Sequence, residues 1–206
     1  MKLSKSYRMF IATAATAVLV TSAVSSSAAA SFTDVSDRYK EAVDYLVDQE
    51  ITNGLTDTTF GVTDQIKRGD AAVMIARALD LDRSSAPESG FTDVPERARE
   101  SVNILKQQGI INGKTDVKFG AEDTLTRGEM AIILSRAYAL TGSSILSFTD
   151  VGDRYLDAVQ AMVYNGITQG KTETQFGTQQ EIMRGEFALF IYRAEGNVTP
   201  EVIEVN

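Results

Sequence analysis

The chain has 206 residues, of which 20 are basic and 28 acidic, so its formal net charge at neutral pH is −8. This balance argues against nucleic acid as the natural partner, because phosphate backbones require a basic surface. Cysteine and histidine are absent, which excludes zinc sites made of thiolates or imidazoles and the nucleophilic systems that use either side chain. We expect neither a metal nor a cofactor.

Residues 1–30 predict a secretory signal peptide. Three basic residues precede an apolar run at 9–20, and the small residues at 28–30 offer a cleavage site before Ser31. The run is too short to span a bilayer. Its removal would take away three basic and no acidic residues, changing the net charge from −8 to −11. We therefore expect a secreted protein of the cell wall or cell surface, with no membrane span.

Three copies of one module follow, at residues 31–80, 90–141 and 147–196, and a short acidic tail occupies 197–206. Each copy opens with Phe-Thr-Asp-Val, at 32–35, 91–94 and 148–151. The same residue types then return at matching offsets: Ile51, Ile110 and Ile167; Phe60, Phe119 and Phe176; Arg68, Arg127 and Arg184; and Arg77, Arg136 and Arg193. Repetition at a period of tens of residues indicates a repeat architecture.

The first segment of each repeat predicts an amphipathic helix. In the first repeat the apolar stripe has the spacing i, i+3, i+4 and i+7, formed by Tyr39, Ala42, Val43 and Leu46. We expect the helix to end near Gly54, or the glycine to turn the loop that follows, because glycine tolerates a left-handed backbone. The phenylalanine of that loop is expected to be a buried anchor.

The second helix of each repeat begins at the arginine motif. In the second repeat Thr126 and Glu129 match a capping box. The apolar residues that follow are nearly continuous, which indicates burial on most sides. Three such helices predict an all-α domain of three helical pairs, in which the three tandem repeats form a pseudo-threefold bundle with short loop prongs. A single repeat is too small to bury its second helix alone.

These residues resemble the S-layer homology family: Phe-x-Asp-Val, a helix, a Gly-containing turn, a phenylalanine loop and a Thr-Arg-Ala-Glu-like motif. The resemblance covers residues 32–196. It implies non-covalent anchoring of exported proteins to a secondary cell-wall polysaccharide linked to peptidoglycan, often one with ketal-linked pyruvate. Surface-layer proteins are further expected partners. We expect no catalysis, because the repeats account for almost the whole exported chain.

The resemblance assigns the candidate ligand-binding residues to the arginine motif. Its arginine is Arg68, Arg127 and Arg184, and its acid is Asp70, Glu129 and Glu186. A guanidinium pairs with a carboxylate in a bidentate manner, and the free amides of a helix N-terminus favour an anion. The alternative is an intramolecular salt bridge, either to the acid two residues on or to a neighbouring repeat. The second arginines are expected to be structural.

Two further sets of candidates have alternative roles. Asp34, Asp93 and Asp150 precede the first helices, where they either cap helix amides or contact the ligand. Tyr39 and Tyr155 stand where the family often has tryptophan, and they either pack or stack on a sugar; the second repeat has Ala98 there. The motif alanine is replaced by Gly69, Gly128 and Gly185.

Among the motif arginines we predict that Arg127 matters most for binding, because the second repeat has both the Thr126 cap and the Glu129 acid. Two other hypotheses compete with glycan binding. One is a structural surface-layer subunit that acts through self-association or partner proteins. The other is a stand-alone relative of the anchoring repeats of longer enzymes.

Overall fold

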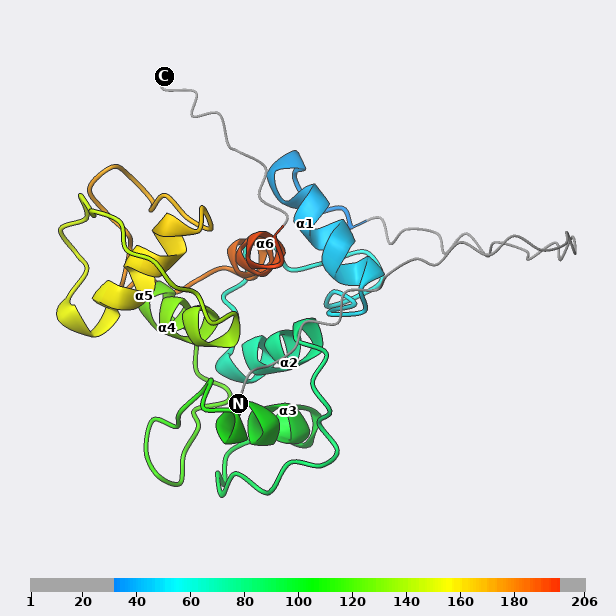
Figure 1. Cartoon of the computed structure of the whole chain (residues 1–206). Helices are drawn as coiled ribbons and strands as arrows, with labels where there is room; N and C mark the ends of the chain where they lie inside the picture. Colours follow the sequence, from blue (N-terminus) through cyan, green and yellow to red (C-terminus); the bar gives the residue numbers. More distant parts are fainter. Residues whose placement is uncertain (1–31, 197–206) are drawn as a thin grey trace, which may run out of the picture.

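The computed structural model describes residues 32–196, which form an all-α fold (Figure 1). The predicted signal peptide and the tail lie outside the described residues. None of the described helices has the length and hydropathy that a bilayer crossing requires. In chain order the helices are α1 (Asp37–Asp48), α2 (Arg68–Ala78), α3 (Glu96–Gln107), α4 (Arg127–Ala137), α5 (Asp153–Tyr164) and α6 (Arg184–Ala194).

The helical pairs that form the arms of the molecule combine different repeats. Helix α3 packs against α2, α5 against α4, and α1 against α6, as Figure 1 shows. The first helix of each repeat therefore packs on the second helix of the preceding repeat, and the α1–α6 pair closes the cycle. As a result, every arm needs residues from two repeats.

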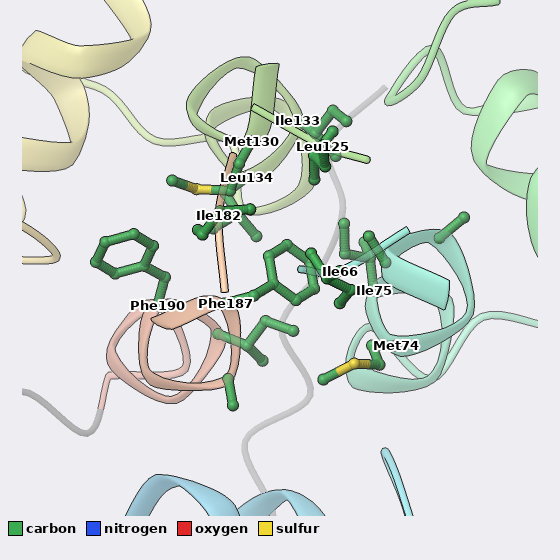
Figure 2. Close-up of a cluster of buried hydrophobic side chains, with 14 of the residues drawn as sticks. Ile66, Met74, Ile75, Leu125, Met130, Ile133, Leu134, Ile182, Phe187 and Phe190 are labelled. Carbon is green, nitrogen blue, oxygen red and sulfur yellow. The ribbon is translucent and has the colours of Figure 1, made fainter. Parts of the chain in front are cut away.

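The second helices α2, α4 and α6 surround the centre of the molecule, where their apolar side chains meet (Figure 2). Equivalent positions at this centre carry side chains of very different size, namely Ala71, Met130 and Phe187, each exposed by 1% or less. The ring of Phe187 points between the three helices (Figure 2). A core packed to native density has room for one such ring at the axis, so the sequence departs from threefold symmetry where the helices converge.

A ring of three backbone hydrogen bonds surrounds the same centre. The N–H of Ile66 donates to the carbonyl of Ile182 (3.1 Å), that of Ile182 to Leu125 (2.9 Å), and that of Leu125 to Ile66 (3.1 Å). Their side chains are exposed by 1% or less. Each repeat thus donates to one neighbour and accepts from the other, and the buried backbone groups are satisfied only when all three repeats are present.

The first helices end earlier than the glycine pattern predicts. Helix α1 ends at Asp48 rather than near Gly54. The chain leaves it through Glu50, which has a left-handed backbone (φ 57°), and Gly109 and Gly166 hold the same place after α3 and α5 (φ 71° each). Gly54 (φ 80°) turns the following loop instead. The alternative interpretation of that glycine, as a loop-turning residue, is therefore the one confirmed.

The exchange of helices between repeats leads to a testable prediction. A fragment of residues 90–141 contains α3 and α4 but lacks α2 and α5, on which they pack. We expect it to be largely unfolded in circular dichroism and to show no cooperative thermal transition, because both apolar helix faces are left exposed to water. Residues 31–196 should unfold in a single transition. A sharp transition of the 90–141 fragment would contradict the shared core.

Candidate functional site

The motif arginines open α2, α4 and α6, and the first turn of each helix docks on the following repeat. The N–H of Arg127 donates to the carbonyl of Gln180 (2.9 Å) and that of Gly128 to Thr178 (3.0 Å). The same amides of the other two helices donate in the same way: Arg68 to Asp123, Gly69 to Ala121, Arg184 to Asp64 and Gly185 to Val62. These amides are already paired, so the expectation that they are free to bind an anion is wrong.

We call each boundary between a motif arginine and the following repeat a seam. At the seam between the second and third repeats, Arg127 is 1% exposed. Its Nε donates to the carbonyl of Phe176 (2.9 Å), and its Nη1 donates to Oε1 of Glu186 (3.2 Å). Burial lowers the pKa of the Arg127 guanidinium, and the Glu186 carboxylate opposes that shift. Of the alternatives for Arg127, the salt bridge to a neighbouring repeat is therefore present.

The seam between the first and second repeats follows the same plan. Arg68 is 6% exposed, and its Nε donates to the carbonyl of Phe119 (3.1 Å). Its Nη2 donates to the carbonyl of Asn112 (3.2 Å), and its Nη1 lies 3.6 Å from Oε1 of Glu129. The guanidinium also lies 4.8 Å from the centre of the Phe119 ring, a distance typical of a cation–π contact.

The second repeat has the predicted capping box, but its arginine and its acid do not pair with each other. The Thr126 hydroxyl accepts a hydrogen bond from the Glu129 N–H, and the Glu129 carboxylate accepts one from the Thr126 N–H (both 3.2 Å). That carboxylate pairs with Arg68, whereas Arg127 pairs with Glu186. Thr126 and Glu129 therefore hold the start of α4 as predicted, but the acid that pairs with Arg127 is Glu186.

The seam that closes the cycle, between the third and first repeats, lacks an ion pair. Arg184 is 7% exposed, and its Nη2 donates to the Thr52 hydroxyl (2.6 Å). No carboxylate of residues 32–196 lies within 4.0 Å of its guanidinium. Its Nε is buried without a hydrogen-bond partner. The acid at this position is Asp70, which is one methylene shorter than glutamate and pairs with Arg97 (3.1 Å).

The aspartates before the first helices hold the phenylalanine loops. Oδ1 of Asp34 accepts from the N–H of Phe60 (2.8 Å), and Oδ2 accepts from Gly61 (2.7 Å) and Val62 (3.0 Å). Asp150 accepts the three corresponding bonds in its repeat, and Asp93 accepts two, from Phe119 and Gly120. The helix-capping interpretation is wrong, because the N-cap residues are Ser36, Pro95 and Gly152 and none of them makes a side-chain cap.

We call each aspartate with the loop amides it binds an aspartate clamp; the clamp holds the loop and favours the ionised carboxylate. Burial alone would raise the pKa of Asp150, but hydrogen bonds from the amides of Phe176, Thr178 and Gly177 outweigh it and hold the pKa below its usual value. The pKa values of Asp34 and Asp93 are lowered in the same way. The loop phenylalanines are exposed by 1% or less and are confirmed as anchors: Phe60, Phe119 and Phe176.

Two grooves lie beside the seams. The Arg68 groove, of about 470 Å³, has five charged lining residues: Arg68, Lys114, Glu129, Arg136 and Arg154. The Arg184 groove, of about 320 Å³, has four: Asp70, Arg77, Arg97 and Arg184. Both volumes fall within the range of small-molecule sites, roughly 300–1,000 Å³. Each groove collects arginines from all three repeats, because the helices are exchanged between repeats.

At the seam between the second and third repeats, two cations share one acid. Glu186 contacts Arg127 (3.2 Å) and Lys171 (3.7 Å) through the same oxygen. The structure thus brings each motif arginine close to the following repeat, and it gives the three seams different ion pairs.

A family model described as S-layer homology domain matches residues 31–72, 90–131 and 147–188. The chain belongs to the S-layer homology family. The predicted resemblance, with its three tandem repeats, is thereby confirmed.

Similar proteins support the family assignment. The chain is 32% identical over 216 residues to the surface-layer 125 kDa protein of Lysinibacillus sphaericus, covering 96% of this chain and 18% of that protein. It is 29% identical over 198 residues to S-layer protein EA1 of Bacillus anthracis, covering 91% and 23%. An endoglucanase of Bacillus sp. (strain KSM-635) is 29% identical over 161 residues, covering 71% and 16%.

The chain thus spans about a fifth of the length of these relatives. The family match and the S-layer relatives indicate a cell-surface protein associated with the S-layer. A region shared by surface-layer proteins and an enzyme indicates an anchoring domain rather than a catalytic one.

The glycines in the S-layer homology motif are explained by close packing. A Cβ added at Gly128 would lie 2.7 Å from Cγ2 of Thr178 and 2.9 Å from Cε1 of Tyr155. Tyr155 is 9% exposed, so its ring packs against this glycine. One at Gly185 would lie 3.5 Å from Cδ1 of Tyr39. The packing role of Tyr155 is confirmed, while sugar stacking by the partly exposed Tyr39 stays a prediction.

The arginines contributed by the first helices were not among the predicted site residues. Arg154 lines the Arg68 groove and Arg97 lines the Arg184 groove. Both are exposed and stand near the start of their helices. A signal was available, because Arg38, Arg97 and Arg154 stand at equivalent positions, each directly after an acid.

The aspartate clamp gives a prediction for stability and its pH dependence. Replacing Asp150 with alanine removes three charge-assisted hydrogen bonds and should cost about 2 kcal/mol of unfolding free energy at pH 7. Because the folded pKa is lowered, this stabilisation is present above the unfolded pKa of about 4 and is lost as the pH falls through the folded value. The Tm difference from wild type should therefore shrink towards pH 2.

The measurement is thermal unfolding of wild type and Asp150→Ala between pH 2 and pH 7. Asp157→Ala, which removes an exposed acid of α5, is the control and should change Tm little. An equal Tm difference at both ends of the pH range would contradict the clamp.

Proposed function

We propose that the chain binds an anionic secondary polysaccharide linked to peptidoglycan, and that it does so in the grooves beside its seams. The observation that carries the proposal is the Arg68 groove, where Arg68, Arg136 and Arg154 line one cavity. These arginines gather in a chain whose net charge is −8. Such a local cluster of cations favours an anionic ligand even though the chain as a whole repels one at long range.

The groove has the chemistry that a substituted sugar requires. Guanidinium groups bind a carboxylate through paired N–H donors, and a ketal-linked pyruvate supplies such a carboxylate. Ile132 and Ile133 line the same groove and offer an apolar surface to a sugar ring. Carbohydrate binding in this groove therefore combines charge pairing with apolar contact.

The other candidate residues support the grooves under this proposal. The Arg127–Glu186 pair and the three aspartates hold neighbouring repeats and loops in place. Direct ligand contact by Asp34, Asp93, Asp150, Tyr39 or Glu186 stays a prediction.

The proposal is tested by cosedimentation of residues 31–206 with purified cell walls. We expect the protein to pellet with intact walls and to stay in the supernatant after chemical removal of the secondary polysaccharide. Binding should survive a moderate rise in salt, because contacts inside a groove are screened less than surface charges separated by more than about 8 Å.

Three outcomes would count against the proposal. Equal pelleting with stripped walls would contradict glycan recognition. A steep loss of binding between low and physiological salt would indicate a diffuse surface attraction instead. Pelleting without any walls would support self-association, the alternative function.

A further inference from the structure

The two grooves carry the same three arginine positions but differ in what neutralises them. In the Arg184 groove these positions are Arg184, Arg77 and Arg97, and in the Arg68 groove they are Arg68, Arg136 and Arg154. The position contributed by a first helix, Arg97 or Arg154, shows the clearest difference between the grooves.

In the Arg184 groove the first-helix arginine is neutralised by one acid that lines the groove and by another beside it. Nη2 of Arg97 lies 3.1 Å from Oδ1 of Asp70 and 3.3 Å from Oε1 of Glu122. The third arginine, Arg77, donates to the carbonyl of Ile51 (3.4 Å). A ligand anion that entered this groove would have to compete with two carboxylates for Arg97.

The Arg68 groove lacks both of these neutralising contacts. The residue equivalent to Glu122 is the uncharged Gln179, and the residue equivalent to Asp70 is Glu129. Glu129 is occupied by Arg68 and by the N–H of Thr126 in the capping box. Arg154 is left over the ring of its neighbour Tyr155 (5.3 Å).

Two exposed arginines of this groove therefore keep their charge available. Within residues 32–196 no carboxylate lies within 4.0 Å of the Arg136 or Arg154 guanidinium. Four cations and one acid line the groove, and of the cations Lys114 is paired with Asp123 (2.6 Å). Two unpaired guanidiniums facing one cavity form a receptor for a carboxylate, whose planar shape matches their paired N–H donors.

We propose that the Arg68 groove takes the carboxylate substituent of the wall glycan through Arg136 and Arg154, and that the Arg184 groove contributes little to this recognition. The proposal rests on the proposed glycan-binding function and names the groove and the charged group it binds. The difference between the grooves comes from the exchange of Glu122 for Gln179 and from the capping box that engages Glu129.

Matched variants at equivalent positions test the proposal. We measure binding of residues 31–206 to purified walls for Arg154→Ala and for its counterpart Arg97→Ala. Arg154→Ala should weaken binding by about tenfold or more, because a charge-assisted contact is lost. Arg97→Ala should weaken it by less than about threefold. Arg154 has no ion pair within the described chain, so Arg154→Ala should leave Tm unchanged.

A second pair of variants adds or removes the neutralising acid without shortening an arginine. Gln179→Glu places an acid beside Arg154 and should weaken binding by about tenfold. Glu122→Gln, which removes the corresponding acid from Arg97, should not weaken it. Both positions are exposed, which favours correct folding.

The ligand group is tested on walls whose carboxylates have been reduced with carbodiimide and borohydride, a treatment that leaves phosphodiesters intact. Loss of wild-type binding supports a carboxylate; unchanged binding overturns the carboxylate assignment in favour of phosphate. Equal losses for Arg154→Ala and Arg97→Ala, or wild-type affinity of Gln179→Glu, would overturn the choice of groove. Failure of the wild type to bind intact walls would refute the proposed function itself.

Discussion

The rest of the structure depends on one interaction: a guanidinium buried at the boundary between two repeats pairs with groups of the following repeat. Arg68 and Arg127 each reach the loop and the acid of the following repeat, and the amides beside them bond that repeat's backbone. Charges this far from water are costly unless they are paired, so each repeat needs its neighbour. The same dependence appears in the exchanged helical pairs and in the closed ring of Ile66, Leu125 and Ile182.

The seams and the grooves divide the arginines between two tasks. The motif arginines are buried and hold the repeats together, whereas Arg136 and Arg154 are exposed in the Arg68 groove. Under the proposed function, a ligand would therefore meet a backbone framework that the seams already hold in place, and the ordering of exposed arginine side chains would be the main entropic cost. Repeats that share one backbone plan thus have grooves of different charge through single exchanges such as Glu122 to Gln179.

The repeats, the all-α fold and the buried second helices could be predicted, because constant spacing and apolar periodicity report these features directly. The partners of individual side chains could not. Periodicity identifies the apolar face of α1 but not the helix that covers it, which is α6. Arg127 and Glu129 are two residues apart on one helix and so point in different directions. The amides bound by Asp34 begin 26 residues away, and the local sequence suggested a cap instead.

The central claim, that a buried ion pair joins neighbouring repeats, is tested most directly by a double-mutant cycle on Arg127 and Glu186. The unfolding free energies of wild type, Arg127→Ala, Glu186→Ala and the double variant are measured in urea. We predict that Arg127→Ala costs about 3–5 kcal/mol of unfolding free energy and that the coupling free energy between the two residues is about 1–3 kcal/mol. Single-variant costs that add to within about 0.5 kcal/mol would contradict it, because the two side chains would then act independently.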